Sequence, residues 1–115
     1  MKIKTSELKG DALDWAVAKC EQELYAATHH GKLLSMDYLM EGCASTDWSE
    51  GGPIIERERI TSSYEGKGVW IAGGFNGVAY IMNYPGPTPL IAAMRCYVAS
   101  RLGDEVEVPD ELKGD

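Results

Sequence analysis

The chain has 115 residues, of which 44% are hydrophobic and 25% are charged, and its formal net charge is −7. This length and composition are typical of one globular domain whose core needs no disulfide or metal. No apolar run is as long as a membrane span, and the N-terminal sequence MKIKTSELKG lacks the hydrophobic region of a signal peptide. We therefore expect a cytoplasmic protein that does not bind membranes.

The negative charge is concentrated in residues 104–115, which hold six acidic residues and one lysine. The rest of the chain holds 12 acidic and 10 basic side chains and is nearly neutral. Because no basic stripe is present, we do not expect duplex DNA as a partner. We interpret residues 1–103 as a single α+β domain and residues 104–115 as an acidic, solvated and partly disordered tail.

The cysteines and histidines do not form a metal-binding pattern. Cys20, Cys43 and Cys96 are odd in number, widely spaced and without a CxxC pair, so we expect three small buried residues rather than a disulfide or a zinc site. His29 and His30 are adjacent and would point in different directions, which favours a solvated helix end. No cofactor is expected.

The first half of the chain predicts a helix and then a strand. Residues 2–6 indicate a short strand or arm, and helical spacing of apolar residues predicts a helix over residues 11–25 with Asp11 as N-cap. The apolar stripe consists of Leu13, Ala16, Val17, Cys20 and Leu24. Alternation over KLLSMDYLME predicts a half-buried strand near residues 34–40. We expect a loop over residues 42–53, and residues 54–60 fit either an edge strand or a turn of helix.

The second half predicts a hairpin and a closing helix. Two strand-like runs within residues 69–84 flank Asn76-Gly77, the favoured pair for a tight hairpin turn. Three prolines and Gly86 then argue against regular structure before Thr88. Thr88 is the expected N-cap of a helix over residues 89–102 that begins with a proline.

These elements predict an α+β domain, in which the two helices pack on one face of a small antiparallel sheet. The core stripe expected for the second helix consists of Ile91, Met94, Val98 and Leu102.

Three segments resemble the NinX family of lambdoid phages, a group of accessory proteins without an established biochemical activity. Members carry Asp-Trp shortly before Pro-Ile-Ile, which matches Asp47-Trp48 and residues 53–55 here. Members also open their last helix with Asn-Pro-Leu-x-Ala-Ala-Met, which matches residues 89–94, although Thr88 replaces the usual Asn. The Ala-Val-Ala of residues 16–18 is similar as well. Gly51-Gly52 lengthens the loop before Pro53, and residues 25–44 match nothing in the family. The resemblance implies a phage protein acting in the host cytoplasm.

The sequence does not favour an enzyme. It contains no GxSxG, no HExxH, no phosphate loop of the Walker type and no base placed near a plausible nucleophile. We therefore interpret the chain as a non-enzymatic binding protein.

A ligand site is predicted where the aromatic loops and the last helix begin. Aromatic residues gather in the middle of the chain, and the free N–H groups at the start of the last helix suit an anion. Arginines would add phosphate contacts. The predicted ligand-binding residues are Asp47, Trp48, Arg57, Tyr84, Thr88 and Arg95. In this hypothesis Trp48 and Thr88 line one shared hollow.

Four of these residues also have a structural interpretation. Asp47 fits an Asx turn, Trp48 fits packing on the last helix, and Arg57 fits pairing with neighbouring glutamates. Water and Thr88 alone would satisfy the start of the last helix. The sequence leaves these alternatives open.

The leading functional hypothesis is a phage protein that binds a host component, for instance by sequestering a nucleotide-type signal. The alternative is an inhibitor or adaptor that contacts a host protein through exposed aromatic residues or the acidic tail. Self-association into a homo-oligomer stays open as well.

Overall fold

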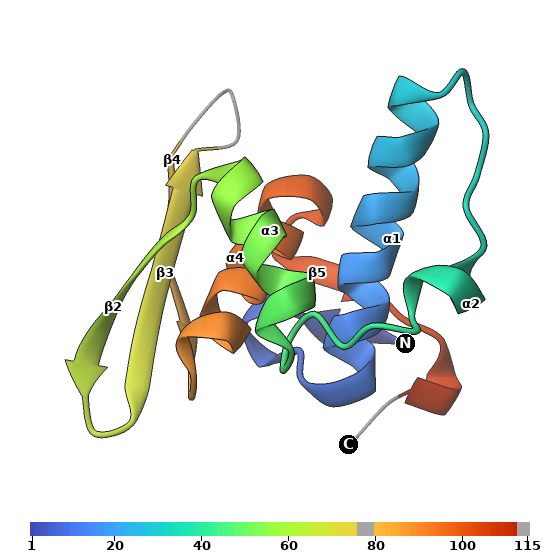
Figure 1. The fold of residues 1–115 in the computed structure, drawn as a ribbon. Helices are drawn as coiled ribbons and strands as arrows, with labels where there is room; N and C mark the ends of the chain where they lie inside the picture. Colours follow the sequence, from blue (N-terminus) through green and yellow to red (C-terminus); the bar gives the residue numbers. More distant parts are fainter. Residues whose placement is uncertain (76–79, 113–115) are drawn as a thin grey trace.

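The computed structural model describes residues 1–75 and 80–112, except for the side chains of residues 75 and 80–83. Its centre is α4 (Pro89–Leu102), which contacts a three-stranded sheet on one side and α1 (Gly10–Thr28) on the other. Figure 1 shows this order, with the sheet, α4 and α1 arranged across the molecule and α3 (Trp48–Glu58) lying along α4. The predicted α+β class is confirmed, and α3 adds a further helix to it.

Helix α4 has the bounds predicted for it. The Thr88 side chain accepts a hydrogen bond of 3.0 Å from the Ile91 N–H, and Pro89 occupies the first turn. Met94 and Val98 are completely buried, as the predicted stripe requires. However, nine of the ten residues from Leu90 to Ala99 are buried, all except Ile91, because the sheet and α1 cover opposite sides of this helix.

Helix α1 is longer than the predicted 11–25 but buries the predicted face. Leu13, Ala16, Val17 and Cys20 are all at most 2% exposed. Its N-cap is Lys9, without a side-chain hydrogen bond, so the assignment of Asp11 as N-cap is wrong. Asp11 instead lies in the first turn, where a carboxylate still favours the helix dipole.

The three-stranded sheet has the order β2 (Thr61–Gly66), β3 (Val69–Phe75) and β4 (Tyr80–Gly86), and all its pairs are antiparallel. The β3–β4 pair confirms the predicted hairpin, whereas its expected Asn76-Gly77 turn lies outside the described residues. Strand β4 continues through Pro85 to Gly86, which corrects the expectation of irregular structure there. Pro85 is tolerated because β4 is an edge strand.

Gly86 lets β4 lie directly against α4. A Cβ atom at Gly86 would be only 2.6 Å from the backbone nitrogen of Ala92 and 2.9 Å from its Cα. Any side chain there would push the strand away from the helix, so this glycine sets the spacing between the two elements.

The strand predicted near residues 34–40 is wrong. This segment contains one helical turn, α2 (Met36–Leu39), and the Ser35 side chain accepts a hydrogen bond from the Asp37 N–H. The Gln22 side chain donates to the Leu34 carbonyl over 2.8 Å, which fixes the segment beside α1. Alternation alone does not make a strand where a Ser cap favours a turn of helix.

The loop predicted over residues 42–53 is also wrong beyond Asp47. Helix α3 begins at Trp48 and includes Gly51, Gly52 and Pro53. Asp47 is its N-cap and supplies the local order that the glycines alone would not provide. Of the two interpretations of residues 54–60, the helical one is right as far as Glu58, and Arg59 ends the helix in the left-handed conformation.

The acidic C-terminal segment is part of the folded body rather than a solvated tail, as far as residue 112. Strand β5 (Glu105–Glu107) pairs antiparallel with β1 (Lys2–Lys4), and η2 (Asp110–Leu112) follows it. Val106 and Val108 are 4% and 2% exposed. These two valines alternate with acidic residues that face solvent, which is the pattern of a half-buried strand. The acidic composition of the segment alone does not indicate it.

No helix among the described residues is long and apolar enough to cross a membrane.

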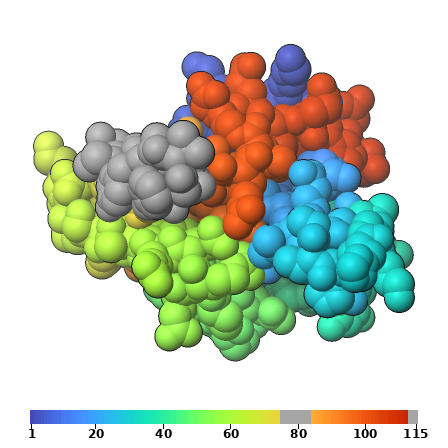
Figure 2. Space-filling model, turned by 90° about the horizontal axis from the view of Figure 1, so that it is seen from above, coloured from blue at the N-terminus to red at the C-terminus, as the bar shows by residue number. Residues whose placement is uncertain are grey.

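Figure 2 shows the orange-red part of the chain, which includes the end of α4, at the surface between the lime and cyan segments. The end of α4 is therefore accessible although its middle is buried.

Candidate functional site

One of the predicted site residues, Tyr84, lines a hollow, and another, Arg95, lies behind it. The hollow has a volume of about 330 Å³, and we call it the Tyr84 hollow. It lies where β1, the turn after it, the end of β4 and the start of β5 come together. Its lining residues are Lys4, Ser6, Tyr84, Pro85, Asp104 and Glu105.

Arg95 lies behind this hollow. Its Nη1 donates to the carbonyl of Pro85 over 2.7 Å, and its Nε donates to the carbonyl of Leu8 over 2.7 Å. The residue is only 9% exposed, and burial lowers the pKa of its guanidinium. None of the described carboxylates forms a salt bridge with it. Arg95 therefore contributes a buried positive charge whose partners are backbone carbonyls.

Tyr84 provides the aromatic wall of the hollow. Its side chain is half-buried, and this burial raises the pKa of its phenol, as does the nearby Asp104. The phenol is therefore neutral at physiological pH and can donate or accept a hydrogen bond.

The Tyr84 hollow combines groups that a small polar ring compound needs. An aromatic ring stacks on a planar base, the carboxylates of Asp104 and Glu105 accept hydrogen bonds from hydroxyl or amino groups, and Lys4 attracts phosphate. Its volume falls in the range typical of small-ligand pockets, about 300–1,000 Å³.

Asp47 and Trp48 form the start of α3. Asp47 Oδ1 accepts hydrogen bonds from the Ser49 N–H over 2.9 Å and from the Ser49 Oγ over 2.7 Å, which lowers the pKa of Asp47. This is the structural role that the sequence left open for Asp47. Trp48 is 55% exposed, so its indole is presented to solvent rather than packed into the core.

The start of α3 and the start of α4 lie at the same end of the molecule. A Cβ atom on Gly51 would be 2.6 Å from the Leu90 Cδ1, which shows how closely the first turns approach. Nevertheless, neither Trp48 nor Thr88 is among the residues that line the Tyr84 hollow. The shared hollow expected from the sequence stays a prediction.

Arg57 forms contacts within the protein. Its Nη1 and Nη2 donate to the two carboxylate oxygens of Glu21 over 3.1 and 2.8 Å, and Nη2 also donates to Tyr97 Oη over 3.0 Å. Its Nε donates to Glu58, as the sequence interpretation of a neighbouring pair allowed. These carboxylates raise the pKa of Arg57. Arg57 therefore connects α3 to α1 and α4.

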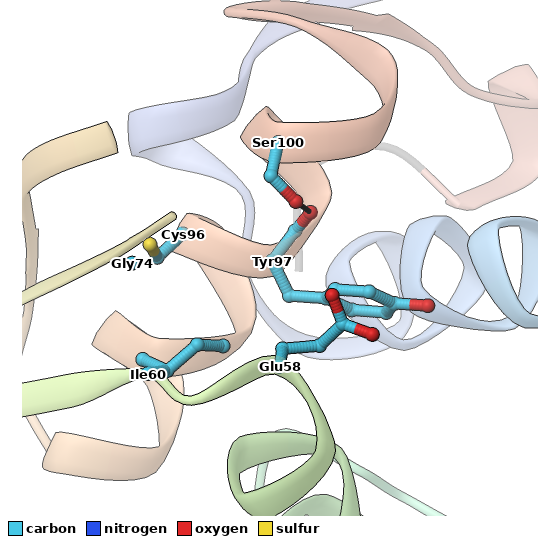
Figure 3. Close-up of a pocket in the computed structure, with 6 residues that line it drawn as sticks. All are labelled: Glu58, Ile60, Gly74, Cys96, Tyr97 and Ser100. Carbon is cyan, nitrogen blue, oxygen red and sulfur yellow. Dashed lines mark hydrogen bonds between the residues drawn. The ribbon is translucent and has the colours of Figure 1, made fainter. Parts of the chain in front are cut away.

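The Tyr97 ring closes a small cavity of about 10 Å³ beside this network. Figure 3 shows Glu58 at the end of α3 and Ile60 just before β2, opposite side chains of α4. A cavity of this size holds at most one water molecule, so it is not a ligand site.

The cysteines behave differently from one another. Cys20 and Cys96 are buried as expected, and burial raises the pKa of their thiols to about 12 and about 11. Cys43 is exposed, which corrects the expectation that all three are buried, because its segment passes over the surface between α2 and α3. In the described part of the chain no cluster of His, Cys, Asp or Glu suits a metal ion.

Several residues of interest had no clear sequence signal. Lys4, Ser6, Asp104 and Glu105 come from opposite ends of the chain and meet only because β1 pairs with β5. Asp14 is a further such residue, and it is only 8% exposed. Its only sequence signal is its position as a carboxylate beside the apolar stripe of α1.

Comparison with known proteins supports the resemblance stated for the three sequence segments. No curated protein matches the chain. Among protein-family models, the one described as Bacteriophage P22, NinX matches residues 4–101, which include α1, α3, the three-stranded sheet and all of α4 except its last residue. The chain therefore belongs to the phage P22 NinX family.

Proposed function

We propose that this NinX-family protein is a non-enzymatic accessory protein that acts in the host cytoplasm and sequesters a small nucleotide-type molecule in the Tyr84 hollow. The observation that carries the proposal is the convergence of Tyr84, Lys4 and two carboxylates on one hollow of about 330 Å³. The proposal requires no catalytic step, because binding alone removes a signal from the host.

The charges around the hollow suit a nucleotide better than a simple anion. Asp104 and Glu105 would repel a bare phosphate, but they can accept hydrogen bonds from ribose hydroxyls or a base amino group. Lys4 lines the same hollow, and the Arg95 guanidinium lies behind the Pro85 carbonyl. A ligand with a planar base, a sugar and a phosphate would use all of these groups.

The first test is thermal unfolding with a panel of linear and cyclic nucleotides. A ligand at 100 times its Kd should add about 2.7 kcal/mol of apparent stability. Lys4→Gln should weaken binding at least tenfold, whereas Lys32→Gln, which removes the same charge from an exposed position, should leave it unchanged. If no nucleotide raises the melting temperature, the proposal is wrong.

A second candidate function is binding of a host protein, and the exposure of Trp48 favours it. Tryptophan is enriched at binding hot spots, and this one is held at the capped start of a helix. Tyr64 on β2 is equally exposed, at 55%, and provides a matched control. Trp48→Ala should abolish recovery of one defined partner by cross-linking in infected cells, while Tyr64→Ala should retain it. Equal recovery by both variants would exclude Trp48 as the contact.

A further inference from the structure

A second hollow lies between α1, α2 and α3 and shares no residue with the Tyr84 hollow. Its volume is about 110 Å³. We call it the Asp14 hollow, and its lining includes Asp14, Glu21, Glu50, Val17, Leu39 and Ile54. The charged residues in this set are all acidic, and most of the others are apolar.

Asp14 has one carboxylate oxygen without a partner. Its Oδ1 accepts two hydrogen bonds from Ser45, over 3.0 Å from the N–H and over 2.7 Å from Oγ. None of the hydrogen bonds among the described residues reaches Oδ2, although Asp14 is only 8% exposed. No fully buried side-chain oxygen in the described structure lacks a partner, so Oδ2 must face accessible space. That space is the hollow that Asp14 lines.

The other two carboxylates differ in their availability. Glu21 is already paired with Arg57 and accepts a hydrogen bond from the Tyr97 hydroxyl. Glu50 forms no ion pair among the described residues and extends over Gly42, where a Cβ atom would be 2.4 Å from its carboxylate. The hollow therefore presents two uncompensated negative charges, one deep at Asp14 and one at the surface at Glu50.

We infer that the Asp14 hollow binds a primary ammonium group carried on an aliphatic stem. The ammonium would donate to Asp14 Oδ2 and to Glu50, and the stem would contact the apolar wall formed by Val17, Leu39 and Ile54. An ammonium suits a single free oxygen better than a guanidinium does, because Ser45 occupies Oδ1 and prevents a bidentate pair. This ligand chemistry is independent of the proposed nucleotide site.

The experiment titrates n-butylammonium into the ¹⁵N-labelled full chain and follows the amide signals of Ser45 and Glu50. We expect saturable shifts at both amides, and n-butanol, which lacks the charge, should bind at least tenfold more weakly. Asp14→Asn keeps an oxygen for Ser45 and should weaken binding at least tenfold. Glu50→Gln changes an exposed residue, so it tests the same site without disturbing the core.

Glu65→Gln, on the exposed strand β2, removes one negative charge elsewhere and should bind n-butylammonium like the parent. The inference is overturned if n-butanol binds equally well, or if Glu50→Gln and Glu65→Gln bind alike. Parallel titrations with spermidine and with N-acetyl-lysine methylamide then distinguish the natural source. Tighter binding of spermidine indicates a free polyamine, and tighter binding of the lysine derivative indicates a partner protein.

Discussion

Arg57 of α3 donates two hydrogen bonds to Glu21 of α1, over 3.1 and 2.8 Å. The pair joins α3 to α1, which are not adjacent along the chain. The hydroxyl of Tyr97 on α4 forms hydrogen bonds with both Arg57 and Glu21. The position of α3 on the body of the protein thus depends on a polar contact as well as on Ile54, which is 5% exposed.

Tyr97→Phe should lower the free energy of unfolding by about 1–2 kcal/mol, since it removes two hydrogen bonds to charged groups from a nearly buried ring. The loss can be measured by urea unfolding at pH 7. Tyr38→Phe is the control, because Tyr38 is 62% exposed, and it should change stability by less than about 0.5 kcal/mol. Equal stabilities for the two variants would contradict the network.

The stability of the protein should fall as pH rises above about 9. The pKa values of Cys20 and Cys96 are raised from 9.0 to about 12 and about 11 by burial. Both thiols therefore keep their protons in the folded chain at pH values where the unfolded chain loses them. Their contribution is complete below pH 9 and is lost up to about pH 11 for Cys96 and pH 12 for Cys20.

Urea unfolding between pH 9 and 11 measures this slope. Each thiol contributes at most about 1.4 kcal/mol per pH unit. Cys20→Ala should reduce the slope by up to this amount, whereas Cys43→Ala, at an exposed position, should leave it unchanged. A slope unaffected by Cys20→Ala would show that this thiol is accessible to solvent.

Gly51 and Gly52 should respond oppositely to substitution by alanine. A Cβ atom on Gly51 would lie 2.5 Å from the Ala44 carbonyl oxygen, so Gly51→Ala should destabilise the fold by about 1–3 kcal/mol. Gly52 has nothing within 4 Å of that position, so Gly52→Ala should stabilise the helix by up to about 1 kcal/mol. Thermal unfolding of both variants is sufficient. The same sign for both would show that α3 does not pack as described.

Met94 is completely buried in α4, and Met94→Ala should cost about 2–5 kcal/mol. Pro89→Ala at the start of the same helix should have little effect, because that position needs no N–H group. If Met94→Ala is as stable as the parent chain, the register of α4 is wrong.

Truncation after residue 103 should destabilise the protein, because it removes β5 and the buried side chains of Val106 and Val108. Circular dichroism during heating measures the change in melting temperature. Val108→Ala is the milder variant and should cost about 2 kcal/mol. An unchanged melting temperature after truncation would restore the interpretation of a solvated tail.

The elements that the sequence predicts well are those with local signals. Thr88-Pro89 and Gly103 define α4 at both ends, and the two strand-like runs within residues 69–84 predict the β3–β4 hairpin. Helix α3 was missed because Gly51, Gly52 and Pro53 are poor helix formers, and only tertiary contacts with Leu90 and Ala44 explain them.

The candidate site was harder to predict than the fold. Tyr84 is among the predicted ligand-binding residues and lines the hollow, but its neighbours there come from both ends of the chain, and long-range pairing of β1 with β5 has no local signature. The charge of Arg57 makes it a candidate phosphate ligand, but in the structure this charge is paired with the Glu21 carboxylate of α1. A single sequence does not show which arginines are paired in this way.

The most direct test of the proposed sequestration identifies what the protein retains. The purified chain is incubated with the small-molecule filtrate of infected host cells, washed and denatured, and the released compounds are analysed by mass spectrometry. We expect a nucleotide-type compound in near-stoichiometric amount from the parent chain and its loss from Tyr84→Leu, with Tyr64→Leu as the control that retains it. Release of no such compound, or equal release from Tyr84→Leu and the parent chain, would contradict the account.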